Sequence, residues 1–474
     1  MKKYLISITS FLLILVPFAR AQENIPEEVL EAAREAARKA AMEVIRQAQD
    51  SIAAIQEAPE PKKTGAQKFL GGLTVGGYGE VALTRNFYSD NVYRYAQPEK
   101  YTGDQHGRFD IPHAVIYIGY DFGKGWSMQT EVEFEHLGTG SAVEREFEEA
   151  GEWEAEIEQG GEVELEQFWL QKSFFPQLNV RAGHIVVPVG GLNNSHEPLN
   201  FFTVYRPEGE FTILPSTWHD TGISIWGTVP LGKKGASMRY EAQVLAGLDA
   251  MRFSRDKFIH NGAHSAFEFK VANSYGGALR LDFMPVTGLR LGLSGFAGNT
   301  VNNTYPKEQL SEQYNVKGTL LVGAFDMQYK GHGVVVRANA DYGHLSDAAT
   351  VSKLKARRSG GDSPYSSAPV ATVAAAAGCE AGVDLFHFIP KLKGKEQFFL
   401  FARYEFYDSY IPGPGDASGF DFTRKHRIAA GINYYPIPQI ALKAEYSHRF
   451  LHSDFNPEPS VSLGIAYMAF FNKK

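Results

Sequence analysis

The stretch WSMQTEVEFEH, residues 126–136, alternates apolar and polar side chains. Met128, Val132 and Phe134 fall on one face of an extended chain, and Glu131 and Glu133 fall on the other. A helix has a period of 3.6 residues and would mix the two kinds of side chain around its axis. The stretch therefore predicts a β-strand with one apolar face and one charged face.

The same alternation recurs at residues 279–283, 289–294, 334–341 and 440–447. Short breaks and long polar stretches separate the strand-like segments in turn. The short breaks are residues 122–125, 175–178, 230–235, 285–288, 330–333, 389–395 and 435–438, and the long stretches are residues 85–107, 139–161, 188–218, 249–274, 300–317, 346–377, 411–421 and 451–458. Seven short turns and eight long loops then separate sixteen strands.

The strands of a soluble β-sandwich show the same alternation, but a sandwich places its apolar face inward. Here the polar face is rich in full charges, which suits a wet lumen, and the asymmetry of turns and loops has no reason to exist in a sandwich. Aromatic residues near strand ends indicate a girdle at the membrane interface, namely Trp126, Trp169, Tyr329, Tyr434, Tyr435 and Tyr467. We therefore expect an all-β transmembrane barrel of 16 antiparallel strands, with short periplasmic turns and long extracellular loops.

The first 68 residues have a different character. Two lysines, an apolar run and a small-residue cleavage site predict a signal peptide, residues 1–21, removed after Ala21. Residues 22–60 are rich in Ala and Glu, and Leu30, Ala37 and Val44 recur every seven residues, which favours a periplasmic helix in a short coiled coil. A single helix lying on another surface fits equally well. Residues 61–68 then form a linker, and residues 69–474 form the barrel.

Composition excludes several classes of protein. The chain of 474 residues has 47 basic and 54 acidic residues and a pI near 6.1, which argues against nucleic-acid binding. Its single cysteine, Cys379, excludes a disulfide framework. Residues 141–166 hold eleven Glu and one Arg, and we expect this acidic segment on the extracellular side, where it would concentrate cations or form an ordinary solvated surface.

Three segments resemble the phosphate-selective porin O/P family, in the version found in Bacteroidetes-type bacteria. They are residues 163–170, residues 194–222 with their NSHEP and WHDTG motifs, and residues 281–291. The resemblance spans about residues 69–471. It implies a homotrimeric sixteen-stranded porin whose third long loop folds inside the barrel.

The loop from Val189 to Trp218 also has its own apolar surface, including Phe201 and Phe202, which predicts that it folds into the lumen rather than into water. Packing of these aromatic residues between subunits is the alternative. The candidate constriction residues are His196, Glu197, Arg206, Glu208 and Glu210.

Strand parity places a second set of candidates on the lumen wall, where they could bind anions or pair with neighbouring carboxylates. These basic residues are Arg239, Arg280, Arg290, Arg337, Arg403, Arg427, Lys443 and Arg449. In the family that the chain resembles, arginines of the inserted loop help to select phosphate. Here Arg206 is the one Lys or Arg between Val189 and Thr217, so the solute and the ion preference stay open.

The sequence thus predicts a passive porin in contact with outer-membrane lipids, open to small hydrophilic solutes, with no catalytic residue, metal or cofactor. An outer-membrane lipid esterase with a Ser and a His on the outer face of the barrel is one alternative, and His184, His196 and His219 are expected near Asp220, where a His/Asp pair could serve catalysis. A barrel that hands larger ligands to a partner protein is another.

Overall fold

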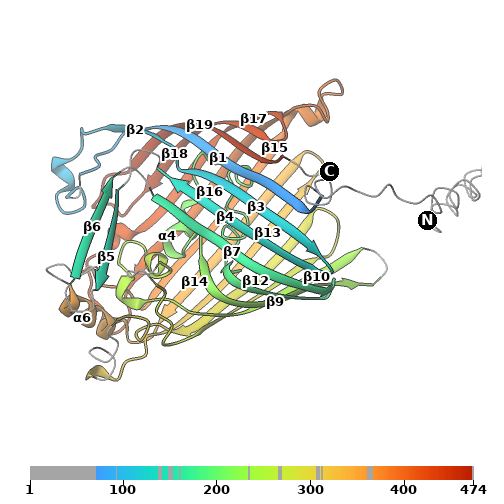
Figure 1. The fold of residues 1–474 in the computed structure, drawn as a ribbon. Coiled ribbons are helices and arrows are strands. Elements are labelled where there is room, and N and C mark those ends of the chain that lie inside the picture. Colours follow the sequence, from blue (N-terminus) through green and yellow to red (C-terminus); the bar gives the residue numbers. More distant parts are fainter. Residues whose placement is uncertain are drawn as a thin grey trace, which may run out of the picture. The chain divides into compact units, whose positions relative to one another are not determined.

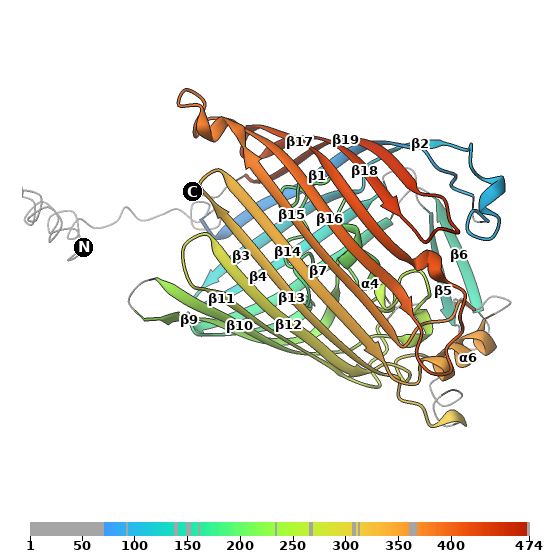
Figure 2. The ribbon, with the colours of Figure 1, turned by 180° about the vertical axis from the view of Figure 1, so that it is seen from behind.

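The computed structural model describes residues 71–471, apart from residues 92, 137–140, 148–152, 160–161, 233–234, 265–268, 306–309, 311–312 and 360–366. The predicted signal peptide, periplasmic helix and linker lie outside the described residues, and their boundaries stay predictions. Over residues 71–471 the chain forms a closed antiparallel β-barrel, seen from opposite sides in Figure 1 and Figure 2.

The wall strands follow one another around the barrel in chain order. They are β1 (Leu73–Asn86), β2 (His106–Asp110), β3 (His113–Gly123), β4 (Trp126–Glu135), β7 (Glu162–Phe175), β8 (Leu178–Val186), β9 (His219–Leu231), β10 (Ala236–Leu245), β11 (Gly276–Met284), β12 (Leu289–Asn299), β13 (Thr319–Gly331), β14 (Val334–Leu345), β15 (Val373–Asp384), β16 (Gln397–Ile411), β17 (Arg424–Ile437), β18 (Ile440–Phe450) and β19 (Glu458–Phe470).

The barrel closes where β1 pairs with β19 on one side and with both β2 and β3 on the other. β2 pairs with the last residues of β1 and β3 with its first residues, so the two are halves of one wall strand, interrupted at Pro112, which has no N–H to donate. Counted this way, the described wall has sixteen strands, which confirms the predicted fold class.

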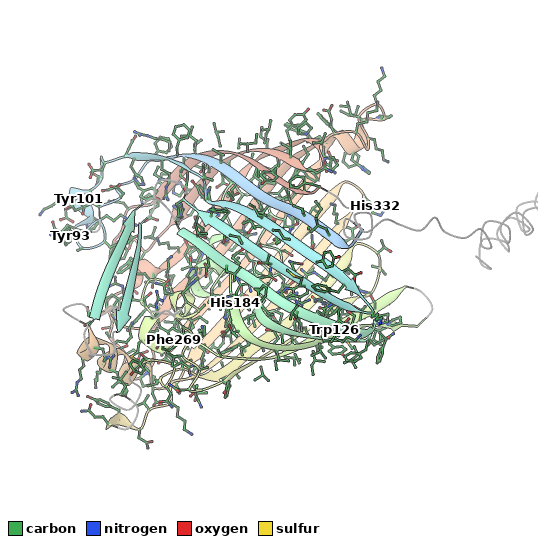
Figure 3. The ribbon with its side chains drawn as sticks, viewed as in Figure 1. Tyr93, Tyr101, Trp126, His184, Phe269 and His332 are labelled. Atoms are coloured by element: carbon green, nitrogen blue, oxygen red, sulfur yellow. The ribbon has the colours of Figure 1, made fainter. Side chains whose placement is uncertain are left out.

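The short connections all lie at one end of the barrel and the long ones at the other, which we call the turn end and the loop end (Figure 1). Figure 3 marks both ends: Trp126 and His332 lie near the turn end, and Tyr93, Tyr101 and Phe269 lie near the loop end. The turns fall where the sequence predicts them, for example between β3 and β4 and between β11 and β12. An even number of strands brings the start of β1 and the end of β19 to the turn end.

Two long connections contain more structure than the sequence predicts. The acidic segment forms a separate hairpin of β5 (Ser141–Phe147) and β6 (Trp153–Gln159) at the loop end (Figure 1). The stretch 346–377 is not all loop, because helix α6 (Ala348–Arg358) follows β14 and β15 already begins at Val373. Single 3-10 turns complete the described connections: η2 (Pro98–Lys100), η3 (Ala250–Arg252), η4 (His260–Gly262), η5 (Leu385–Phe388) and η6 (Asp421–Thr423).

The wall has its apolar face outside and its charged face inside. On β11, Leu279, Leu281 and Phe283 are 37–52% exposed, whereas Arg280 and Asp282 between them are buried. A soluble protein would bury the leucines, so this inverted arrangement is that of a barrel whose outer face meets lipid. Among the described helices, none is long and apolar enough to cross a membrane.

One strand departs from the predicted parity. At a β-bulge between β4 and β7, Glu131 pairs with Gln167 and Val132 with Leu165, so Glu166 is an extra residue. Both Glu166 and Gln167 are therefore buried, and every later side chain of β7 changes face. The predicted girdle position of Trp169 is wrong for this reason, since Trp169 is 8% exposed and turned into the barrel. Tyr435, also predicted for the girdle, is buried inside as well.

Candidate pore constriction

The connection between β8 and β9, residues 187–218, lies inside the barrel, and we call it the inserted loop. Its phenylalanines pack against the inner wall: Phe202 joins a buried cluster with Phe399 and Phe401 of β16 and Val335 of β14. Phe201 is also buried, at 2% exposed. The expectation that this loop folds inward is met, and packing of its aromatics between subunits does not fit, because they are covered by their own barrel.

The wall side chains hold the loop by its backbone. The ammonium of Lys443 donates to the carbonyls of Pro198, Phe201 and Thr203 at 2.5, 3.0 and 2.8 Å. Carboxylates of β16 and β18 accept hydrogen bonds from N–H groups of the loop. Glu445 accepts from the N–H of Val204 at 2.8 Å, and Glu405 accepts from the N–H of Gly209 at 3.0 Å. The loop pairs with no strand, and these backbone N–H and carbonyl groups therefore form their hydrogen bonds with charged side chains of the wall.

A short helix, α4 (Glu208–Ile213), fixes the far part of the loop. Glu208 pairs with Arg449 and accepts from the hydroxyl of Tyr407 at 2.8 Å. Burial alone would raise the pKa of Glu208, but Arg427 and Arg449 hold it well below its usual range. Glu208 is therefore an anchor ionised at all ordinary pH values.

Glu210, two residues further along α4, is in a different environment. It is 2% exposed, and its carboxylate accepts from the N–H of Leu192 at 2.7 Å. Burial, and then the neighbouring charge of Asp326, raise the pKa of Glu210 to about 7. Its charge therefore changes within the physiological pH range.

A partly open cavity lies between the inserted loop and the wall formed by β12 to β16, and we call it the passage. Its polar lining comes from the loop through Ser195, Asn200 and Glu210, and from the wall through Arg290, Asp326, Gln328, Arg337, Asn339, Glu380 and Arg403. Because it is polar and lies between the inserted loop and the wall, the passage is the candidate route for a solute.

The charges of the passage are unequally exposed. Arg290 lies 2.5 Å from Asp326, and Arg337 lies 2.5 Å from Glu380. The arginine side chains are 25% and 21% exposed, whereas those of Asp326 and Glu380 are 3% and 0% exposed. The carboxylates therefore sit behind the guanidinium groups, and a solute meets the positive partner of each pair first.

The five constriction candidates lie in different places in the structure. Glu210 lines the passage, and Glu208 anchors α4. His196 and Arg206 are buried on the other side of the loop, against β1, β4 and β7, where Arg206 donates to the carbonyl of Ser216 at 3.2 Å. Glu197, which is partly exposed, accepts from Asn200 within the loop at 2.7 Å.

The eight wall candidates also take three different positions. Arg290, Arg337 and Arg403 line the passage. Arg427, Lys443 and Arg449 hold the loop, as does Arg280, which donates to the carbonyl of Gly190 at 2.9 Å and pairs with Asp282 and Asp326. Arg239 lies apart, near the β9–β10 turn, paired with Glu241 at 3.1 Å.

Sequence reasoning missed Glu380, which neutralises Arg337 and also accepts from the N–H of Phe202 at 3.4 Å. The signal was available, because Gly378, Glu380 and Gly382 alternate with Cys379, Ala381 and Val383.

Asp220 does not form the His/Asp pair that the sequence allowed. Asp220 accepts from the N–H of Gly247 at 2.8 Å and lies 3.6 Å from Lys270, so its carboxylate is engaged away from His219. His184 lies beside the hydroxyl of Thr221 at 3.2 Å.

No protein-family model matches the chain. An uncharacterized protein of Aquifex aeolicus (strain VF5) is 26% identical over 387 residues, which cover 79% of this chain and 75% of that protein. Similar solved structures include an anion-selective porin from Comamonas acidovorans (11% identity, 84% of this chain and 99% of that one, TM-score 0.46) and the outer-membrane channel DcaP of Acinetobacter baumannii (12%, 84% and 97%, TM-score 0.47). OmpF of Salmonella typhi in complex with daunomycin is similar to the same degree (12%, 84% and 98%, TM-score 0.46).

Proposed function

We propose that the chain is an outer-membrane porin that lets small hydrophilic solutes diffuse passively and prefers anions. The observation that carries this proposal is the passage, which is polar, bounded by an inserted loop, and lined by guanidinium groups more exposed than their carboxylate partners. An anion entering it meets Arg290 and Arg337 before it meets Asp326 and Glu380.

The resemblance to phosphate-selective porins of the O/P type extends the proposal to oxyanions such as phosphate. A guanidinium group is planar and permanently charged, and its fork of N–H donors matches two oxygens of a phosphate or carboxylate. In this chain the arginines of the wall, rather than those of the inserted loop, would supply these donors, because Arg206 is buried away from the passage.

Single-channel recording in a KCl gradient tests the proposal. The wild-type reversal potential is expected to have the sign of an anion-preferring channel, and the double variant Arg290→Gln/Arg337→Gln should move it towards zero. Arg239→Gln is the matched control, since this arginine is also paired with a carboxylate but lies outside the passage. A cation-preferring wild type, or a double variant that behaves like the control, would refute the anion preference.

Swelling assays with uncharged solutes of graded size separate a filter from a barrel that binds and hands on its ligand. A porin admits every solute below a size limit, without saturation. Saturable uptake of a single solute class would instead favour the handing-on function.

We also propose that the barrel is a homotrimer with its turn end in the periplasm, assembled with the help of the helix at residues 22–60. Three barrels side by side would bring three such heptad helices together. A peptide of residues 22–60 should gain helicity with concentration. A peptide that remains random coil at high concentration, together with barrels that assemble normally without it, would remove the helix from the assembly.

A further inference from the structure

A group of buried acids and histidines lies behind the inserted loop, on the side away from the passage. Glu131 comes from β4, Glu166 from the bulge of β7, and His219 from the first residue of β9. Their ligand atoms all lie within 4.8 Å of one another. Both carboxylates are 0% exposed and His219 is 6% exposed, so bulk water does not solvate them.

Each of these side chains presents an unused polar atom to the group. In the part of the chain that the structure describes, Oε1 of Glu131, Oε2 of Glu166 and Nε2 of His219 are buried and make no hydrogen bond. Burying such atoms without partners is unfavourable, and more so for a charged group than for a neutral one. Three orphaned atoms at one point therefore need a common partner.

His196 of the inserted loop adds a fourth atom of the same kind. Its Nδ1 lies 3.0 Å from the carbonyl of Asn193, which only an Nδ1–H can satisfy, so in the neutral ring Nε2 carries a lone pair. This Nε2 is buried without a hydrogen bond and lies 3.9 Å from Oε1 of Glu131. A lone pair facing a carboxylate oxygen at that separation is repulsive unless a proton or a metal cation lies between them.

The local charge is also unbalanced. Glu133, the third buried acid, has two basic neighbours, with His113 at 2.6 Å and Arg206 at 3.9 Å. By contrast, the second oxygen of Glu131 accepts from Gln167, and that of Glu166 accepts from Thr217. These donors are neutral, so a cation placed between Glu131 and Glu166 would be stabilised by both carboxylates.

We propose that Glu131, Glu166, His219 and His196 bind one divalent transition-metal ion of the zinc type. Two carboxylates and two imidazole nitrogens form a four-ligand set, and zinc bonds of roughly 2.0–2.2 Å require only small movements of these side chains. Calcium and magnesium prefer oxygen ligands alone, so the two histidines select against them. The ion joins the wall at β4, β7 and β9 to the inserted loop and thereby clamps the base of the loop.

Metal uptake by the full-length, folded barrel tests the site without any measurement of transport. The detergent-solubilised protein is stripped with a chelator, dialysed against buffered free Zn²⁺, and analysed by elemental mass spectrometry. We expect about one Zn²⁺ per chain, with no comparable uptake of Ca²⁺ or Mg²⁺. Glu166→Gln and His219→Gln should each weaken Zn²⁺ binding at least 10-fold.

Glu241→Gln is the matched control, because Glu241 is also a buried glutamate of the wall but has Ser224, Gln243 and Arg239 as partners. It should bind Zn²⁺ like the wild type. Uptake that the ligand variants do not reduce would place the metal elsewhere and overturn the proposal, as would a wild type that binds none.

A second measurement needs no variant, in case a substitution prevents folding. Co²⁺ added to the stripped wild type should give the visible absorption of a four- or five-coordinate nitrogen and oxygen site, and equimolar Zn²⁺ should abolish it. A spectrum identical to that of aqueous Co²⁺ would overturn the proposal.

Discussion

Lys443 illustrates how much of the site depends on single side chains. The residue is 4% exposed. Its ammonium donates to three carbonyls of the inserted loop and lies 4.4 Å from the ring centroid of Phe201. Strand parity alone places Lys443 among eight basic residues of the lumen wall and does not distinguish it from the others. Its role as an anchor follows from contacts more than 200 residues apart along the chain, which no local pattern contains.

Lys443→Met should therefore loosen the inserted loop without changing the wall. Three buried carbonyls would lose their donor, at a cost of at least about 2 kcal/mol. We expect a lower midpoint of urea-induced unfolding and a noisier open-channel current. Lys393→Met, on an exposed turn residue, is the control. If the two variants have the same unfolding midpoint and the same open-channel current noise, Lys443 does not hold the loop.

Glu210 makes the passage sensitive to pH. With its pKa raised to about 7, the side chain is largely neutral at pH 6 and largely charged at pH 8. The folded state therefore binds a proton more tightly than the unfolded state does. Its contribution to stability is full below an ordinary carboxyl pKa of about 4.3 and is lost as the pH rises through about 7.

The ion preference should follow the same titration. One added negative charge at about 10 Å is worth about 0.4 kcal/mol in water, unfavourable for an anion and favourable for a cation, so the anion-to-cation permeability ratio should fall about three- to fourfold between pH 6 and pH 8. Glu210→Gln should remove this dependence. A pH profile that is the same in wild type and variant would assign the titration to another group.

At the scale of elements, the strands were predictable and the exceptions have local causes. The alternation at residues 126–136 fixes the face of every side chain of β4, and the structure agrees. On β7 the same logic fails after Glu166, because one inserted residue reverses the parity and turns Trp169 inward. A bulge leaves no separate mark in the sequence, since Glu166 and Gln167 are both polar.

The inserted loop was predictable in position but not in its contacts. Its apolar residues indicated that it would leave water, yet the same residues could have packed between subunits. What places it inside is a set of complementary partners on β16, β17 and β18, including Glu405 and Glu445. The position of Arg206 behind the loop, instead of in the passage, depends on these long-range contacts too.

Removal of residues 195–214 should open the barrel. The deletion takes away Phe201, Phe202 and helix α4, which fill the lumen beside the passage. Single-channel conductance is expected to rise several-fold, provided that heat-modifiable migration on gels shows a folded barrel. An unchanged conductance in folded barrels would mean that the narrowest point lies outside the inserted loop.

At the scale of the whole molecule, the inserted loop divides the lumen of the barrel into two unlike sides. On one side lies the passage, with its exposed arginines. On the other lies the dry group of Glu131, Glu166, His196 and His219, which holds the base of the loop. Transport and loop attachment are thereby assigned to different residues, and they can be tested separately.

The most direct test of the central claim uses the single native cysteine. Cys379 lies on the outer face of β15, so a charged thiol reagent should leave the wild-type conductance unchanged. Asn339 lines the passage from β14. In Cys379→Ser/Asn339→Cys barrels, we predict that a positively charged methanethiosulfonate lowers single-channel conductance in one discrete step per open barrel. A conductance that does not change after modification, verified by mass spectrometry, would show that solutes do not pass between the inserted loop and this wall.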